Sequence, residues 1–172
     1  MAVHAVCETT NLRAVHYAER IWDAVSEKDI DNGTIGYLDG VSVKGGVIYY
    51  VGPTPAKPGR AIGSAGPTSS YRMDAYSEPL MQQGLKVMIG KGPRSEEYRQ
   101  MLVKYGAIYV SAIGGAAASI SESVKKCDLV CYEDLGAEAV YRLEVEGFFG
   151  IVTYDSKGND LFAQEIKKYK KI

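Results

Sequence analysis

The chain has 172 residues and a mass of 18.7 kDa, which is the size of one domain. Its 20 Lys and Arg nearly balance its 21 Asp and Glu, and the net charge of −1 argues against binding that depends on bulk charge, such as non-specific binding to nucleic acid. No apolar run approaches the roughly 20 residues of a membrane-spanning helix. We therefore expect neither a nucleic-acid partner nor a membrane partner.

The cysteines and the start of the chain bear on the compartment. The chain has three cysteines, Cys7, Cys127 and Cys131. This number is small for a disulfide scaffold, and it is odd, whereas disulfides need cysteines in pairs. The first twelve residues do not place an apolar region after a basic one, as a secretory signal does. A reducing environment is the expectation that follows, and we predict a cytoplasmic protein.

The first quarter of the chain is the part with the weakest β pattern. Apolar residues at helical spacing predict an amphipathic helix over residues 13–26. The following residues carry several Gly, Asn and Asp turn signals around two short strand candidates, residues 34–38 and 41–43.

A Pro-rich loop separates the first buried strand candidate from the first helix of the central region. Residues 47–51 are apolar and rich in β-formers, and residues 52–59 contain three of the six prolines, which excludes a central strand there. Residues 60–65 are the candidate return strand. Residues 74–83 predict a helix that ends at Gly84, a residue suited to a helix C-terminus.

Strands and helices alternate over the rest of the central region. Ser95 is a candidate N-cap and Gly106 a candidate stop for the helix between them. The pattern predicts strands at 85–89, 107–112, 129–132 and 149–154, and helices at 95–105 and 116–125. Residues 137–146 are ambiguous between helix and strand. A turn is predicted at 155–159, followed by a last strand edge that begins at Leu161 and runs into a basic helix. This alternation predicts an α/β fold with a mixed, partly parallel sheet, in a single domain over residues 1–172.

A hydroxyl-rich turn opens the predicted helix that follows the Pro-rich region. Thr68, Ser69 and Arg72 lie within this turn, residues 66–74. Backbone N–H groups at a helix start carry partial positive charge, and with hydroxyl groups and an Arg beside them they suit a carboxylate or a phosphate. The alternative is an ordinary capped helix start, for which Ser and Thr are common residues.

Two further segments follow predicted strands. Lys91 lies between two glycines at the end of a predicted strand. Ligands bind at the carboxyl ends of strands in open α/β sheets, so Lys91 can contact the same carboxylate or phosphate as the hydroxyl-rich turn. The alternative is a solvated lysine in a loop. Residues 113–118 are small, which permits close approach of a ligand or of another backbone, or tight packing of a helix on the sheet. The glycine spacing matches neither a Walker loop nor a dinucleotide motif.

Metal and nucleophile patterns are weak. Cys127 and Cys131 lack the two-residue spacing of a zinc knuckle, and buried structural thiols are the favoured interpretation. His4 and His16 are the only histidines, so a multi-histidine metal site is excluded. No G-x-S-x-G motif supports a catalytic triad.

Six segments in order carry a resemblance to a known family. They read VIYYVGPTPAKPG, IGSAGPTSSYRMD, GLKVMIGKG, AIGGAAA, YEDLGAEAVYRLEV and YDSKGNDLF, and the resemblance that they carry covers about residues 44–164. Together they resemble the C-terminal domain, or separate β subunit, of the iron–sulfur (class I) fumarate hydratases and the related tartrate dehydratases. The resemblance implies a swivelling β/β/α domain with three layers.

The same resemblance implies a division of labour in a hydro-lyase of the tricarboxylic acid cycle. The enzyme reversibly dehydrates a hydroxy-dicarboxylate, most commonly malate to fumarate, and is active only when the β subunit meets its α subunit. The α subunit holds a [4Fe–4S] cluster, whose open iron binds the substrate hydroxyl. By resemblance, Thr68 acts in proton abstraction, while Arg72, Lys91 and Ser69 bind the dicarboxylate substrate.

The first 43 residues depart from the family pattern. Where the family has a segment like TARDAAH, this chain has TTNLRAVHYAER, in which Arg13 is the nearest counterpart of a substrate-binding arginine. This atypical N-terminal segment motivates an alternative, a non-catalytic binding or assembly module derived from the same domain. In either case an exposed apolar surface is expected where the α subunit docks, and a homodimer is expected for the chain in isolation.

Overall fold

The computed structural model of the chain describes residues 2–6, 37–38 and 41–171. The helix predicted over residues 13–26, the first part of the strand predicted at 34–38, and the candidate residue Arg13 lie outside the described residues.

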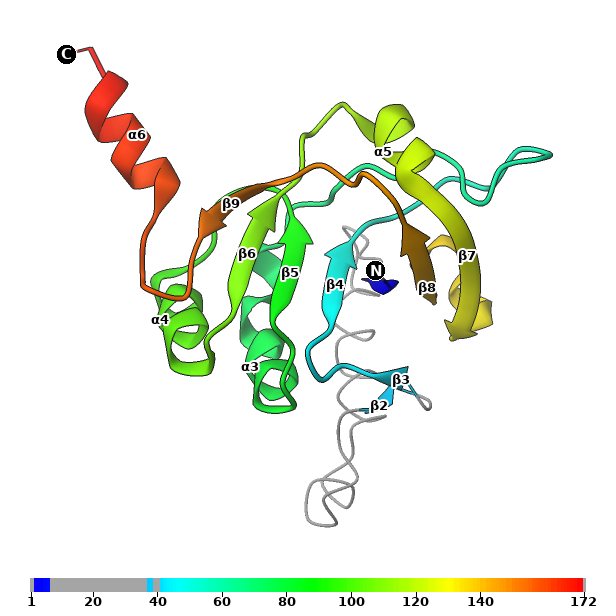
Figure 1. Cartoon of the computed structure of the whole chain (residues 1–172), viewed down its shortest axis with the longest axis horizontal. Helices are drawn as coiled ribbons and strands as arrows, with labels where there is room; N and C mark the ends of the chain where they lie inside the picture. The colour runs from blue at the N-terminus through cyan, green and yellow to red at the C-terminus, as the bar shows by residue number, and fades with distance from the viewer. Residues whose placement is uncertain (1, 7–36, 39–40, 172) are drawn as a thin grey trace.

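A seven-stranded mixed sheet forms the centre of the molecule, with the order β7-β8-β1-β4-β5-β6-β9 (Figure 1). The four central strands run parallel: β1 (Ala2–Val6), β4 (Val47–Tyr50), β5 (Val87–Gly90) and β6 (Ile108–Ser111). Antiparallel strands flank them: β8 (Val140–Val145) and β7 (Val124–Cys131) beside β1, and β9 (Ile151–Tyr154) beside β6. A separate hairpin joins β2 (Tyr37–Leu38) to β3 (Val41–Ser42). The expected α/β class with a mixed, partly parallel sheet is confirmed.

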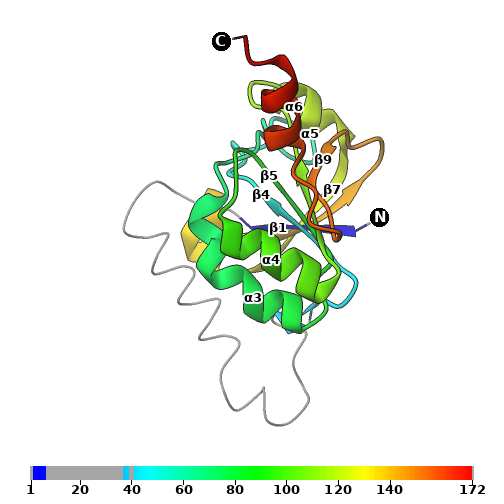
Figure 2. The same ribbon diagram turned by 90° about the vertical axis from the view of Figure 1, so that its left-hand side faces the viewer.

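Two helices cover one face of the central strands. Figure 2 shows α3 (Asp74–Gln82) and α4 (Glu96–Tyr105) side by side, and the 3₁₀ turn η1 (Tyr71–Met73) leads directly into α3. The remaining helices are α5 (Ala117–Ser123), the 3₁₀ segment η2 (Glu133–Glu138) and α6 (Leu161–Tyr169), and α6 projects away from the body of the molecule (Figure 1). No helix among the described residues is long and apolar enough to cross a membrane.

The alternation of side chains along β4 divides the core into two clusters. Ile48 and Tyr50 pack into the cluster beneath α3 and α4. Val47, Tyr49 and Val51 point the other way, into a cluster that includes α5 and the flanking strands. All four residues of β4 are buried, as expected for a parallel strand in the middle of a sheet.

The predicted boundaries of the first two central helices, α3 and α4, agree with the structure to within one residue. The Ser95 hydroxyl accepts the backbone N–H of Tyr98 at 3.1 Å at the start of α4, and Gly106 ends that helix in the left-handed conformation, with φ of 60°. Gly84 follows α3 with φ of 94°, which a side chain would disfavour.

Three sequence-based boundaries are wrong, and each has a physical reason. Residues 60–65 contain bends instead of a return strand, because the loop is joined across only at Thr54, whose N–H donates to the Ser64 carbonyl and whose carbonyl accepts the Gly63 N–H. The helix expected to Lys125 ends at Ser123, and the chain extends into β7. No strand begins at Leu161, because the Asp160 carboxylate accepts the N–H of Ala163 at 2.9 Å and starts α6 there.

Candidate active site

The loops that follow β4 and β5 meet at one edge of the sheet. The two strands are parallel neighbours, so their carboxyl ends lie together. The Thr68 N–H donates to the Tyr50 carbonyl at 3.0 Å, and the Lys91 N–H donates to the Thr68 carbonyl at 3.1 Å. The Ser70 N–H donates to the Lys91 carbonyl at 3.1 Å, and Ser69 and Lys91 form a parallel bridge. The main chains of Thr68, Ser69 and Lys91 therefore lie side by side, and their strands are neighbours as the predicted anion site requires.

The close approach of these loops requires Gly90. A Cβ atom at this position would lie 1.8 Å from the Ser70 Oγ and 2.8 Å from the Tyr109 hydroxyl oxygen, well inside any van der Waals contact. Ser70 is fully buried, and its hydroxyl donates to the Thr68 carbonyl at 3.0 Å. Burial raises the pKa of Tyr109 to about 12, so its hydroxyl stays neutral beside Ser70.

The small residues after β6 bring a third loop to the same place. A Cβ atom at Gly114 would lie 3.4 Å from the Lys91 Cδ, so the lysine side chain passes over this glycine. Gly66 and Ala117 are in tight contact, and the Ala65 N–H donates to the Ala117 carbonyl at 3.0 Å. The small residues at 113–118 therefore allow close packing against another segment of backbone, and the approach of a ligand there stays a prediction.

The hydroxyl groups of the turn do not serve as ordinary helix caps. Ser70 is the N-cap residue of η1, yet its side chain makes no capping hydrogen bond, and neither does Met73 before α3. Arg72 lies within η1, two residues after Ser70, and is half-buried like Thr68 and Lys91. The segment thus carries Thr68, Ser69 and Arg72 beside the loop that carries Lys91.

Two charged residues beneath the site were not found by the sequence reasoning. Arg94 follows Lys91 by three residues, and its side chain is fully buried against the rings of Tyr98 and Tyr109, with the guanidinium carbon 3.5 Å and 4.7 Å from the ring centroids. Asp74 forms an ion pair with it. Both residues lie within or beside the motifs, but no sequence pattern separates a buried arginine from an exposed one.

The described residues do not fit an iron–sulfur cluster. They contain no group of three His, Cys, Asp or Glu placed to hold a metal ion. Cys127 and Cys131 are half-buried on β7 and form no disulfide within the described part of the chain, and burial raises the pKa of the Cys127 thiol. We therefore derive no reaction step through a cluster from these residues.

An apolar pocket of about 400 Å³ lies away from the site. It is lined by the Pro-rich loop, β7 and the region of η2, including Pro53, Ile62, Leu129 and Tyr141. None of Thr68, Ser69, Arg72 and Lys91 lines it.

Comparison with known proteins identifies the family to which a chain with this fold and these three loops belongs. The family model described as the fumarase C-terminus matches residues 8–165, which is most of the chain. This chain belongs to that family, as the six motifs predicted.

Curated relatives fall into two kinds. The chain is 42% identical over 124 residues to the aerobic class I fumarate hydratase of Salmonella typhimurium, and 41% identical over 119 residues to the mitochondrial fumarate hydratase 1 of Leishmania major. These matches cover 71% and 68% of this chain but only 21% and 22% of the relatives, so the chain spans about a fifth of their length. A Methanocaldococcus jannaschii protein, assigned by name as an L(+)-tartrate dehydratase subunit beta, is 37% identical over 133 residues, 73% of this chain and 68% of that protein.

Proposed function

We propose that this chain is the β subunit, or β domain, of a hydro-lyase that reversibly dehydrates malate to fumarate. The names of the relatives support the reaction class, and the 42% identity to the aerobic class I fumarate hydratase of Salmonella typhimurium supports fumarate as the product. In this proposal residues 1–172 form a single domain in which residues 1–43 are an atypical N-terminal segment.

The observation that carries the proposal is the bridge between Ser69 and Lys91 at the carboxyl ends of β4 and β5. It brings a lysine from one motif beside the hydroxyl groups of another, and Arg72 follows within one turn. Two cationic groups and two hydroxyl groups at one edge of a sheet suit a small dianion.

The chemistry assigns a role to each group. Dehydration removes a proton from the carbon next to a carboxylate, so negative charge develops on that carboxylate in the transition state. Arg72 and Lys91 stabilise this charge, and Ser69 donates a hydrogen bond to the substrate. Thr68 acts in the proton transfer, with the cationic groups around it favouring its deprotonated form. Arg13 supplies a second carboxylate contact.

The rest of the enzyme belongs to an α subunit in this proposal. The fumarate hydratase relatives are about five times longer than their match to this chain, which supports a partner or a further domain that completes the cleft. By family resemblance that partner holds the [4Fe–4S] cluster. The small and odd number of cysteines in the chain supports assembly in the cytoplasm.

The test is co-expression with the α subunit encoded in the same genome, purification without oxygen, and a fumarate hydration assay. We expect the complex to hydrate fumarate. We expect Arg72→Ala to lower kcat/KM by about 100-fold or more, because one fixed donor to developing charge is lost.

Arg142→Ala is the matched control, because Arg142 is an exposed arginine on β8 whose ion pair with Asp128 is a surface contact. Its kcat/KM is expected to stay within about twofold of the wild type. A complex that binds dicarboxylate but shows no turnover would overturn the hydro-lyase proposal and favour the binding module. Full activity of Arg72→Ala would overturn the assigned role of that arginine.

A further inference from the structure

Arg94 is a charged residue that is buried among aromatic side chains. Its side chain is fully buried, and its guanidinium carbon lies 3.5 Å from the ring centroid of Tyr98, 4.7 Å from that of Tyr109 and 5.6 Å from that of Tyr50. Burying a cation is costly unless it is paired and hydrogen-bonded, so a residue of this kind is retained for a reason other than simple burial.

Asp74 compensates the charge and at the same time joins two segments. Its Oδ1 accepts the Nε–H of Arg94, and its Oδ2 accepts the backbone N–H of Ser95 at 2.8 Å. Asp74 is the first residue of α3, two residues after Arg72, and Arg94 is three residues after Lys91. One carboxylate therefore fastens the Arg72 segment to the Lys91 segment.

A second contact extends this connection into α3. The Arg94 Nη2 lies 3.4 Å from the Ser77 Oγ, and that hydroxyl donates to the Met73 carbonyl at 2.6 Å. The Arg94 N–H also donates to the Tyr154 hydroxyl at 3.3 Å, which holds the start of the loop against β9. The guanidinium is thus held through its Nε by Asp74 and through its Nη2 by Ser77, while its buried Nη1 has no hydrogen-bond partner among the described residues.

We propose that Asp74 and Arg94 are a pair of positioning residues that set the placement of Arg72 relative to Lys91. The inference rests on the proposed function, because it assigns the pair to the site that binds the dicarboxylate. A rigid dianion with carboxylates at both ends demands cationic groups at a fixed spacing, and displacements of about 1 Å are enough to lower the rate. The pair acts through these two residues and does not contact substrate.

A double-mutant cycle separates positioning from mere stabilisation of the fold. Arg94→Lys keeps the charge but loses the planar fork that bonds Asp74 and stacks on the tyrosines. In the complex with the α subunit, we expect Arg94→Lys to lower kcat/KM for fumarate hydration by about tenfold or more. In a Lys91→Ala background the same substitution should change kcat/KM by less than about twofold, because the group that it positions is already absent.

A purely structural role predicts another pattern. In that case Arg94→Lys lowers kcat/KM by the same factor in the wild-type and in the Lys91→Ala background, and that result would overturn the inference. A result in which Lys91→Ala alone leaves kcat/KM unchanged would instead overturn the proposed function, so the two failures are distinguishable.

The matched control is Glu78→Gln. Glu78 on α3 forms an ion pair with Lys104 on α4 at 2.9 Å, so it joins the two helices at a more exposed place, whereas Asp74 and Arg94 join α3 to the loop that precedes α4. We expect its kcat/KM to stay within about twofold of the wild type in either background. A tenfold loss in this variant would show that any contact between the helices matters and would remove the special role of the buried pair.

Asp74→Asn provides the second variant if Arg94→Lys does not fold. It retains the shape and one acceptor oxygen, and we expect it to show the same non-additivity with Lys91→Ala. Succinate titration of the full chain, followed by the amide resonances of Lys91 and Gly92, gives a readout without turnover. Wild-type shifts that persist unchanged in both Arg94→Lys and Asp74→Asn would overturn the inference.

Discussion

At the scale of single residues, the site depends on one position that has no side chain. Gly90→Ala places a methyl group 1.8 Å from the buried Ser70 Oγ, so the loop that carries Thr68 and Ser69 must move away from the loop that carries Lys91. Overpacking of this kind costs about 1–3 kcal/mol. We expect a lower free energy of unfolding in urea, and a fall in kcat/KM of the complex that exceeds what the unfolded fraction explains.

Gly114→Ala is the comparison for this substitution. Its Cβ atom would meet only the Lys91 Cδ, at 3.4 Å, and the flexible end of a lysine can shift. The free energy of unfolding should therefore stay close to that of the wild type. Equal stability of Gly90→Ala and Gly114→Ala would contradict the requirement for glycine at position 90.

The residues of the candidate site were predictable from the sequence to different degrees. Thr68 and Lys91 follow strands and carry obvious chemistry, and the structure places their main chains together. The burial of Arg94 and Asp74 was not predicted, because burial is a property of the folded chain. From the sequence alone, an arginine beside a glycine-rich loop is expected to be exposed to solvent. The side chain of Arg13 lies outside the described residues, so its role stays a prediction.

At the scale of elements, local signals predicted helices better than strands. Ser95 and Gly106 bound α4 because a cap and a left-handed glycine act within one turn of the chain. The strand β8 was left ambiguous, because its identity depends on pairing with β7 and β1, which are distant in sequence. The bends at 60–65 have apolar and β-forming residues, but the fold offers no strand for them to pair with.

At the scale of the whole molecule, the core is unusual in its content of tyrosine. Four tyrosines are among its largest fully buried side chains: Tyr49, Tyr50, Tyr98 and Tyr109. Burial raises the pKa of each above the ordinary value of 10, to about 12 for Tyr109. The folded state therefore favours the neutral hydroxyl, and ionisation takes place first in the unfolded chain.

The sign of the pH dependence follows from these pKa shifts. Below a pH of about 10 the folded and the unfolded chain both hold their tyrosine protons, and the free energy of unfolding does not depend on these groups. Above that pH the unfolded chain loses protons first, and the free energy of unfolding falls. Each buried tyrosine contributes up to about 1.4 kcal/mol of lost stability per pH unit in that window. Urea unfolding at a series of alkaline pH values checks this. Tyr109→Phe should flatten the slope, and native tyrosines that all titrate together near the ordinary pKa would contradict it.

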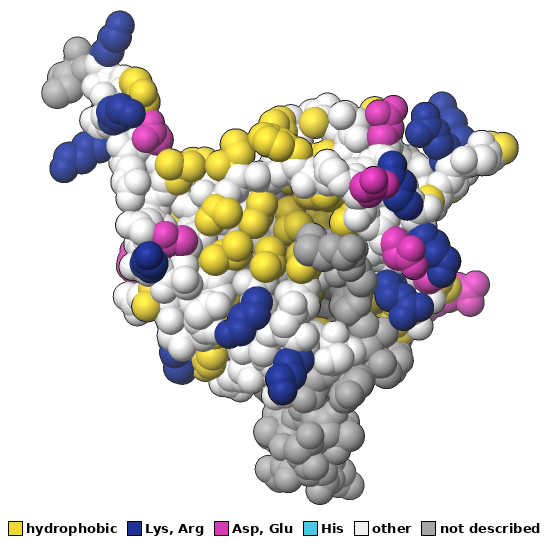
Figure 3. Space-filling model, in the orientation of Figure 1, with side chains coloured by type: hydrophobic (Ala, Val, Ile, Leu, Met, Phe, Trp, Pro, Cys, Tyr) yellow, Lys and Arg dark blue, Asp and Glu magenta, His cyan; other side chains and the backbone are white. Residues whose placement is uncertain are grey.

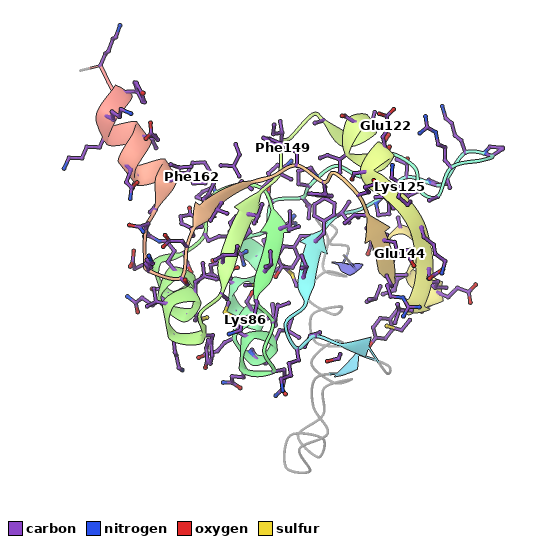
Figure 4. All side chains as sticks on the ribbon, viewed as in Figure 1. Lys86, Glu122, Lys125, Glu144, Phe149 and Phe162 are labelled. Atoms are coloured by element: carbon purple, nitrogen blue, oxygen red, sulfur yellow. The ribbon has the colours of Figure 1, made fainter. Side chains whose placement is uncertain are left out.

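The surface of the molecule carries exposed hydrophobic side chains at one edge of the sheet. Hydrophobic side chains gather over the face of the sheet that α3 and α4 leave open (Figure 3). Phe149, which Figure 4 shows on the segment that enters β9, is 63% exposed, and Ile151 and Val152 on this edge strand are 45% and 47% exposed. Exposed apolar groups at a strand edge mark an interaction site in a soluble protein.

Under the proposed function, we predict that the α subunit docks on the surface that carries Phe149 and Val152, and that the chain alone forms homodimers through it. Ile151, the neighbour of Val152 on β9, points to the other face of the sheet. Phe149→Lys should weaken binding of the α subunit by about tenfold or more, because an aromatic anchor becomes a charge that must be desolvated. The same variant should be monomeric in light scattering. Val103→Lys is the control, since Val103 is 47% exposed on α4, the helix that covers the opposite face, and should bind as the wild type does. Equal affinity of the two variants for the α subunit would place its docking site elsewhere on the molecule.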